Sequence, residues 1–385
     1  MQSSSNFTFQ YRSRIDEINA AEWDKLCGTD YPFLRHAFLA ALESSGSVGE
    51  HTGWHPHHLT VYQQRQLVAV MPLYIKYHSY GEYVFDWAWA EAYQRYNVPY
   101  YPKLLTAIPF TPATGPRLCS APEVDKSLLI AAIVKELQTK TAQGDFSSWH
   151  LLFPPEKEFQ RWNATNLRPR TGCQFHWFNQ GYENFDDFLT TFTSRKRKNI
   201  KRERRRVAEQ GIRLQRLTGE QVTEQHIRDF FIFYQATYLK RGQQGYLTLE
   251  FFLQLRSALA EQLLLVMAYK ENEAVAAALC LHDSSSLYGR YWGCLEEYEC
   301  LHFEACFYQG IEYCIEQGLQ RFDPGAQGEH KILRGFEPIK TWSLHWVEHA
   351  GFREAIDRFL EQEKHGMAHY EKQAALMLPF KNKAP

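Results

Sequence analysis

The densest group of reactive side chains lies in the run FDPGAQGEHKILRGF, residues 322–336. Its polar and charged members include Gln327, Glu329, His330, Lys331 and Arg334. Glu329 or His330 is of the type that acts as a general base, whereas Lys331 or Arg334 suits an anion or a developing oxyanion. The glycines permit tight turns after a strand, and Gln327 is a further candidate contact for a substrate. The alternative is a solvated polar turn, which the apolar segments on both sides disfavour.

A second group occupies the runs YGRYWGC, residues 288–294, and LHFE, residues 301–304. Arg290 lies in an expected strand beside Trp292 and two glycines, a setting that suits a bound anionic group or a ligand close to the backbone. His302 and Glu304 open the helix expected next and are further catalytic candidates. A carboxylate at this place also complements the helix dipole, so catalysis and capping are both open for Glu304.

The N-terminal half has its own charged group, in the run KYHSYGEYVFDW, residues 76–87. Its charged or titratable members Lys76, His78, Glu82 and Asp86 lie among aromatic rings. Charges buried in such surroundings need partners, so we expect these side chains to pair with one another or with a substrate. Lys103 is a further candidate substrate contact. The run WHPHH, residues 54–58, lacks the carboxylate spacing of a metal site, and we assign no metal.

The run RKRKNIKRERRR, residues 195–206, holds nine basic residues and one acid, a net charge of +8. The whole chain carries −1, so the remainder carries −9. Such a concentration of like charge needs compensation by acidic side chains or by phosphates. The candidate contacts to RNA or another anion are Arg195, Lys198, Lys201, Arg202 and Arg205. A solvated helix face is the alternative, and without a helix-turn-helix or zinc module we expect no DNA reading.

A repeated pattern of strands and helices positions these groups. Residues 58–73 and 265–281 each read as strand, polar turn and strand, and Tyr62 aligns with Tyr269. An amphipathic helix and a strand follow each hairpin, at 124–140 and 149–153 in the first half and at 303–317 and 321–323 in the second. The repeat suggests two related α/β domains.

The segment 161–181, with a proline and two glycines, marks the boundary between these domains. We expect an N-terminal domain over 1–172 and a C-terminal domain over 173–385. The second domain is expected to begin with one long basic helix over 185–210. The first contains an aromatic insertion at 78–118, which is too apolar to be a solvated loop and must pack. Packed insertions of this length are usually functional.

The bulk composition fits a two-domain protein. The 385 residues are 44% hydrophobic and 15% aromatic, enough for two packed cores. No apolar run approaches the ~20 residues that span a bilayer, and the N-terminus lacks the pattern of a secretory signal, so we expect a cytoplasmic protein. The 8 cysteines form no C-x-x-C pair and read as buried thiols.

These runs together resemble a bacterial family of FemAB-like proteins in the GNAT acyltransferase superfamily, described as peptidoglycan biosynthesis or recognition proteins. The matching runs are PLYIKYHSYGEYVFDW (72–87), YYPKL (100–104), PFTPATGPRL (109–118), SRKRKNIKRER (194–204), GRYWGC (289–294), LHFE (301–304) and GAQGEHK (325–331). The family usually has Val-Glu-Ala before the last run. Here Phe322-Asp-Pro stands in that place, so the carboxylate is one carbon shorter.

The resemblance implies an α/β (α+β) fold with two tandem GNAT-like (acyl-CoA N-acyltransferase) domains, each a mixed central sheet with flanking helices. It also implies aminoacyl or acyl transfer to an amine. Related Fem enzymes take amino acids from aminoacyl-tRNA and add them to the peptide of a cell-wall precursor. A similar basic helix is common among them, so the cationic run is partly architectural in this interpretation.

One departure concerns the cofactor. A GNAT enzyme that uses acetyl-CoA has a glycine-rich loop whose backbone amides hold the pyrophosphate. The corresponding stretch here, CLEEYECLHFE at 294–304, has three acids before Cys300 and no glycine. Acetyl-CoA is therefore disfavoured, no cofactor is assigned, and aminoacyl-tRNA or another activated acyl donor is expected instead.

Two functional interpretations remain open. The first is an acyltransferase with Glu329 or His330 as base, and with Arg290, Lys331 and Arg334 as anion holders. Its partners would be a small-molecule or peptide amine, such as one in a cell-wall precursor, and tRNA. The second is a non-catalytic protein that recognises a peptide, a cell-wall fragment or RNA. The scattered thiols and histidines disfavour a third, a cysteine or metal hydrolase.

Overall fold

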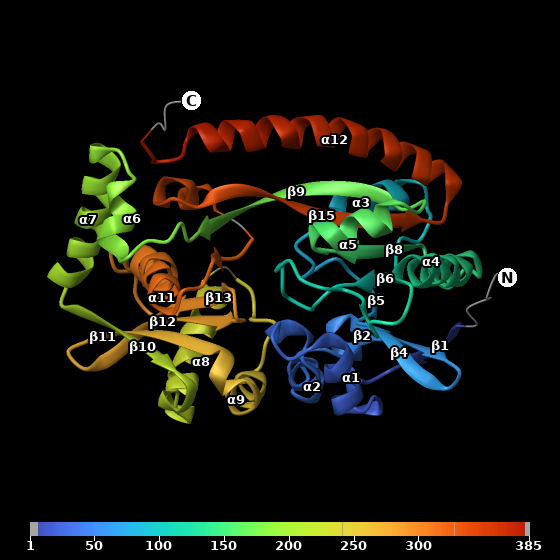
Figure 1. Ribbon diagram of the computed structural model, residues 1–385, viewed down its shortest axis with the longest axis horizontal. Helices are drawn as coiled ribbons and strands as arrows, with labels where there is room; N and C mark the ends of the chain where they lie inside the picture. Colours follow the sequence, from blue (N-terminus) through green and yellow to red (C-terminus); the bar gives the residue numbers. More distant parts are fainter. Residues whose placement is uncertain (1–6, 241, 327, 382–385) are drawn as a thin grey trace. The chain divides into compact units, whose positions relative to one another are not determined.

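Two strands and one helix carry the chain between its two folding units. The computed structural model describes residues 7–240, 242–326 and 328–381 (Figure 1). One unit comprises Met1–Gly172 and Lys340–His369, and the other comprises Cys173–Ile339 and Tyr370–Pro385. Strand β9 (Arg168–Phe178) leads into the second unit, strand β15 (Glu337–Val347) leads back, and helix α12 (Ala350–Leu376) enters the second unit again. The units therefore differ from the two consecutive segments expected from the sequence.

The first unit contains two groups of strands. One is an antiparallel sheet in the order β1-β3-β4-β7, made of β1 (Phe7–Arg12), β3 (His58–Gln63), β4 (Gln66–Met71) and β7 (Cys119–Ser120). The other runs from β15 through β8 (Ser148–Leu152), β6 (Lys103–Thr106) and β5 (Tyr74–Lys76) to β2 (Trp54–Pro56). The hairpin expected at 58–73 is confirmed as β3 and β4, with Leu59 opposite Met71.

The helices of the first unit are α1 (Ala20–Cys27), α2 (His36–Ser44), α3 (Trp87–Arg95), α4 (Lys126–Ala142) and α5 (Glu156–Asn163). Helix α4 begins after Asp125, whose carboxylate accepts the backbone N–H groups of Ser127 and Leu128. Its apolar face packs into a core that includes the buried rings of Trp149 and Trp162. The packing expected for the aromatic insertion at 78–118 is confirmed only in part. The insertion contains α3 and β6, and Trp89 and Tyr93 are buried, whereas Tyr80 and Trp87 are exposed.

The second unit is built on a meander. Its strands lie in the order β10-β11-β12-β13-β14-β9, with β10 (Ile212–Thr218), β11 (Leu263–Lys270), β12 (Glu273–His282), β13 (Ser286–Cys294) and β14 (Arg321–Asp323). The expected hairpin at 265–281 is confirmed as β11 and β12, where Leu264 lies opposite Cys280. Strands β13 and β14 are parallel, and their register places Tyr288 opposite Asp323.

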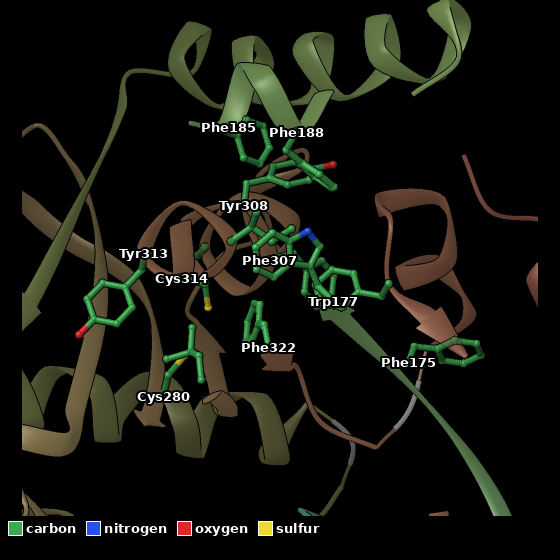
Figure 2. Packing of buried hydrophobic residues seen from close by; sticks show 14 of the residues in the cluster. Phe175, Trp177, Phe185, Phe188, Cys280, Phe307, Tyr308, Tyr313, Cys314 and Phe322 are labelled. Carbon is green, nitrogen blue, oxygen red and sulfur yellow. The ribbon is translucent and has the colours of Figure 1, made fainter. Parts of the chain in front are cut away.

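The helices of this unit are α6 (Phe185–Thr190), α7 (Ser194–Glu209), α8 (Glu224–Leu239), α9 (Leu249–Ala258), α10 (Leu301–Phe303) and α11 (Gln309–Gln317). A π-helical turn, Glu304–Tyr308, joins α10 to α11 where the sequence predicted one helix. Figure 2 shows the aromatic core around it, with Phe185 and Phe188 on one side of Tyr308 and Phe322 on the other side. Helix α8 packs against β13 at Gly293, where a Cβ atom would lie 2.1 Å from the backbone of Phe233.

The single basic helix expected over 185–210 is wrong, because α6 and α7 are separate. Between them the backbone bonds to the C-terminal segment instead of continuing the helix. The Thr193 N–H donates to the Pro379 carbonyl at 2.9 Å, and the Lys381 N–H donates to the Thr191 carbonyl at 2.8 Å. Phe192 forms a β-bridge with Phe380 and is buried.

Candidate functional site

A cavity of about 520 Å³ in the second unit collects many of the predicted residues. Strands β12 and β13, the helical segment 301–308 and the loop after β14 surround it. The predicted residues that line it are Arg290, Trp292, His302, His330 and Lys331. Residues separated by 40 positions meet here because β14 pairs in parallel with β13.

A β-bulge places Arg290 in this cavity. Leu279 of β12 lies opposite Tyr291 of β13, but Cys280 lies opposite Gly289, so Arg290 is the extra residue. A bulge interrupts the ladder and re-aims the side chain of the added residue. In a regular strand, the alternation of side chains between the two faces would fix the direction of Arg290. Here the bulge sets that direction, and the guanidinium of Arg290 lines the cavity.

Lys331 is the buried cation of the site, with only 3% of its surface exposed. It lies in the 3-10 helix Glu329–Arg334, and its Nζ donates a hydrogen bond to the Gly325 carbonyl at 2.7 Å. Burial lowers the pKa of Lys331 to about 8, although the nearby Asp323 carboxylate acts in the opposite direction. Such an amine is mostly protonated at pH 7 and can supply a proton or a hydrogen bond to developing negative charge.

His330 lines the same cavity beside a second imidazole. Its ring centroid lies 5.8 Å from that of His302 and 5.5 Å from that of Phe307. Burial, together with the charges of Lys331 and Arg334, lowers the pKa of His330 below the ordinary 6.5. The ring is therefore neutral near pH 7 and can accept a proton.

Two cysteines, Cys280 and Cys306, also line this cavity. Burial raises the pKa of Cys280 to about 12 and that of Cys306 well above its usual value. Both groups remain protonated near neutral pH, and a thiol in that state is a poor nucleophile. This protonation weighs against the cysteine hydrolase considered from the sequence.

The structure places three other predicted residues outside the cavity lining. Glu329 is exposed and accepts a hydrogen bond from the Tyr370 hydroxyl at 2.8 Å. Glu304 is buried and accepts two hydrogen bonds from Arg204, at 3.0 and 3.1 Å. A carboxylate that already neutralises a guanidinium is held in place, so the geometry favours a positioning role for Glu304.

Arg334 is likewise engaged within the fold. Its guanidinium donates to Glu203 at 2.9 Å and to the Tyr308 hydroxyl at 3.0 Å, and it lies 3.4 Å from the centroid of the Phe303 ring. These contacts hold the 3-10 helix that carries His330 and Lys331. The remaining predicted residue of this run, Gln327, lies outside the described residues.

The basic helix α7 is only partly compensated by neighbouring carboxylates. Arg204 pairs with Glu304 and Glu312, Lys201 pairs with Asp186 at 2.7 Å, and Arg205 pairs with Glu209. Three further side chains are exposed, and within the described part of the chain no ion pair is recorded for them: Arg195, Lys198 and Arg202. These three cations remain available to an anionic partner.

The charged group of the N-terminal half forms a buried cluster. The Lys103 Nζ donates to Glu82 and to Ser79, at 2.9 Å each, and also to Asp86. Burial opposes the charge of Lys103, but the two carboxylates outweigh this effect and raise its pKa. Burial also raises the pKa of Glu82 to about 7, against the influence of Lys103. Glu82 and Asp86 therefore pair with Lys103, which the sequence predicted as a substrate contact, and Lys103 is fully buried within the fold.

Lys76 and His78 lie at the edge of this cluster. The Nζ of Lys76 lies 3.8 Å from the centroid of the Trp54 ring and donates to the Tyr80 carbonyl at 3.3 Å. Burial lowers the pKa of Lys76 to about 6, so its amine is largely neutral at pH 7. His78 is half-buried and bonds to the Thr52 carbonyl at 2.8 Å.

The histidines of the run at 54–58 have separate contacts. His55 bonds to the Glu50 carbonyl, His57 stacks on Tyr11, and His58 bonds to the Glu43 carboxylate. Across residues 7–240, 242–326 and 328–381, no cluster of three or more side chains suited to hold a metal ion is present. None of the helices in these ranges combines the length with the hydropathy that a membrane-spanning segment requires.

Comparisons with known proteins agree with this architecture. A family model described as FemAB-like, peptidoglycan biosynthesis/recognition, matches residues 14–382. No curated protein shows significant sequence similarity to the chain. The crystal structure of FemX is similar, with a TM-score of 0.51 and 12% identity over 88% of this chain and 98% of FemX.

Two further solved structures are similar over comparable lengths. The C-terminal domain of a putative lysylphosphatidylglycerol synthetase from Agrobacterium fabrum has a TM-score of 0.50 and 10% identity, covering 88% of this chain and 95% of its own. A conserved protein of unknown function from Bacteroides thetaiotaomicron has a TM-score of 0.52 and 10% identity, covering 88% and 99%. These likenesses concern the fold alone, and they confirm the α/β class over most of the chain.

Proposed function

Because the chain belongs to the FemAB-like family of peptidoglycan biosynthesis/recognition proteins, we propose that it is an acyltransferase that forms an amide with a substrate amine. The observation that carries the proposal is the cavity of the second unit, which gathers Arg290, His330 and Lys331. An aminoacyl or other activated acyl ester is the proposed donor. The proposed acceptor is an amine of a cell-wall precursor.

The segment between β13 and α10 supports a donor other than acetyl-CoA. Its acidic residues Glu296, Glu297 and Glu299 are exposed just before the helix begins. A helix N-terminus attracts a pyrophosphate through its backbone N–H groups and its dipole. Three carboxylates at that place would repel the same group, so a CoA thioester is disfavoured.

The reaction needs a base and a stabiliser of negative charge. The nitrogen of the neutral acceptor amine attacks the acyl carbon, a C–N bond forms, and the ester C–O bond breaks. His330 accepts the proton that the amine loses, and this proton finally goes to the leaving oxygen. The protonated Lys331 stabilises the oxyanion of the intermediate, and Arg290 holds an anionic part of a substrate. Glu329, the other base candidate, lies outside the cavity lining.

A transfer assay tests this function. The full chain is incubated with tRNA charged with a mixture of radiolabelled amino acids and with a muramyl pentapeptide precursor that carries a free amine. Mass spectrometry then searches for an acceptor whose mass has grown by one amino acid residue. A purely binding protein would retain the acceptor without changing its mass, and that result would contradict the proposal.

The rate of transfer should depend on pH through two groups. Protonation of His330 removes the base, so the rate should fall as the pH decreases. This fall should begin below pH 6.5, because the pKa of His330 is lowered from that value. Deprotonation of Lys331 removes the oxyanion donor, so the rate also falls as the pH rises through about 8. In Lys331→Arg the guanidinium stays protonated, and the alkaline fall should disappear from a kcat/KM profile measured between pH 5 and 10. An unchanged alkaline limb would assign it to another group.

Helix α7 is proposed to contact phosphates of a tRNA donor through Arg195, Lys198 and Arg202. Changing all three to glutamine should weaken tRNA binding at low salt and reduce the slope of log K against log salt by about 2 to 3. Filter binding across a salt series measures both quantities. The matched control changes three exposed lysines of the first unit, Lys126, Lys135 and Lys157, to glutamine and should leave the slope unchanged. Equal slopes in all three proteins would leave α7 with an architectural role only.

A further inference from the structure

A second cavity, of about 920 Å³, lies within the first unit. One wall is a face of helix α3, which presents Trp87, Glu91 and Gln94 at positions i, i+4 and i+7. The facing residues come from two segments, with Tyr80 from one and Tyr100 and Tyr101 from the other. None of the residues of this cavity takes part in the mechanism proposed above.

Aromatic rings dominate the mouth of this cavity. The ring centroids of Tyr80 and Trp87 lie 5.0 Å apart, and the two side chains are 54% and 42% exposed. Large rings exposed side by side are costly for a monomer to leave in water and mark a binding surface. Their π faces carry partial negative charge, which attracts a cation placed over them.

The charges around the cavity also favour the binding of a cation. Glu91 lines the cavity and is exposed, and its carboxylate lies 3.5 Å from the guanidinium of Arg95. Both side chains are exposed to solvent, so this ion pair is weak. His78, the titratable base in the described lining, has its pKa lowered by burial and is neutral near pH 7. The lining thus combines π faces with a carboxylate and brings no opposing positive charge of its own.

The buried cluster of Lys103, Glu82 and Asp86 does not oppose the binding of a cation. The ammonium group of Lys103 is already neutralised by the carboxylates of Glu82 and Asp86. Lys76 is held beside the Trp54 ring, 3.8 Å from its centroid, within the same unit. A cation entering the cavity therefore meets a surface that is neutral to negative in charge.

We infer that this cavity binds a ligand through a protonated amino group. The ammonium lies against the rings of Tyr80 and Trp87, and its N–H groups donate to the Glu91 carboxylate and to the Gln94 amide oxygen. A neutral sugar would also stack on the rings, but it would gain nothing from the charge of Glu91. The inference concerns binding alone and stands independently of the acyl transfer proposed for the second unit.

Isothermal titration calorimetry on the full chain tests this inference with a matched pair of probes. Nα-acetyl-lysine amide carries the ammonium, and Nα-acetyl-norleucine amide keeps the same backbone and four-carbon side chain without the charge. The charged probe should bind at least about ten-fold more tightly than the neutral one. Trp87→Ala and Glu91→Gln should each weaken binding of the charged probe by about ten-fold, whereas Glu123→Gln, at an exposed site outside the cavity, should not.

Three outcomes would overturn the inference. They are equal affinity for the two probes, no effect of Glu91→Gln, or no binding of the charged probe at about 10 mM. Competition by N,N′-diacetylchitobiose without any charge dependence would identify a sugar site instead. Circular dichroism of each variant excludes loss of fold, and Glu91→Gln changes an exposed side chain, so it keeps the test informative if Trp87→Ala is unstable.

Discussion

Replacing Lys331 by methionine is expected to lower kcat/KM for amide formation by about 10²- to 10³-fold, the usual effect of removing an oxyanion donor. The protein should nevertheless stay folded. A buried lysine whose pKa falls to about 8 is destabilised by its surroundings, and methionine fills a similar volume without that cost. Transfer kinetics and urea unfolding on the same preparations separate the two effects.

The loss should appear in kcat as well as in kcat/KM, because the interaction is made with charge that develops in the transition state. Lys340→Met, at an exposed lysine outside the cavity, is the matched control and should keep normal kinetics. Activity of Lys331→Met within about three-fold of the wild type would remove Lys331 from the mechanism. A rise in KM alone would give it a role in binding.

The sequence predicted the local features of the site well. Polar turns between short apolar runs predicted both hairpins, and the run at 322–336 was correctly expected to follow a strand. Arg290 was expected in a strand and lies in one, although its direction comes from a bulge that depends on its register with β12. The flanking glycines were the available local signal for that bulge.

The ion-pair partners of the charged side chains could not be predicted from the sequence, because these pairs form between segments that are distant along the chain. Glu304 and Arg334 looked like site residues in the sequence, but Arg204 and Glu203 of helix α7 occupy them. The sequence predicted compensation of the basic run by acidic side chains or by phosphates, and these contacts supply part of the acidic compensation. The break between α6 and α7 also depends on a distant segment, since residues 379–381 supply its hydrogen bonds.

The exchange of segments between the units was missed for a similar reason. The sequence analysis did not predict a strand at β15, and a strand pattern there would not tell which unit receives its second half. Residues Lys340–His369 pack with the first unit, and there His345 bonds to His150 at 2.7 Å. Both imidazoles are buried, and burial lowers the pKa of each, so the pair is neutral at pH 7.

The largest effect on stability is expected at Lys103. Changing it to methionine leaves the carboxylates of Glu82 and Asp86 buried without their cation, and breaking such a pair costs about 3 to 5 kcal/mol. Urea unfolding at pH 7 measures the loss. The triple change Lys103→Met, Glu82→Gln and Asp86→Asn removes all the charges together and should recover much of the stability. Lys157→Met, at an exposed lysine, should change it by less than about 0.5 kcal/mol.

The pH dependence of this loss follows from the sign of the shifts. Burial already raises the pKa of Glu82 to about 7 in the wild type, and removal of Lys103 raises the carboxylate pKa values of the cluster further. The folded variant then binds more protons than the unfolded chain. Its free energy of unfolding therefore falls as the pH rises above 4.5, the ordinary pKa of a glutamate carboxyl in the unfolded chain. The difference between Lys103→Met and the wild type should therefore be small at pH 5 and largest at pH 8. A difference that stays constant between these pH values would mean that lost packing, and not unpaired charge, causes the destabilisation.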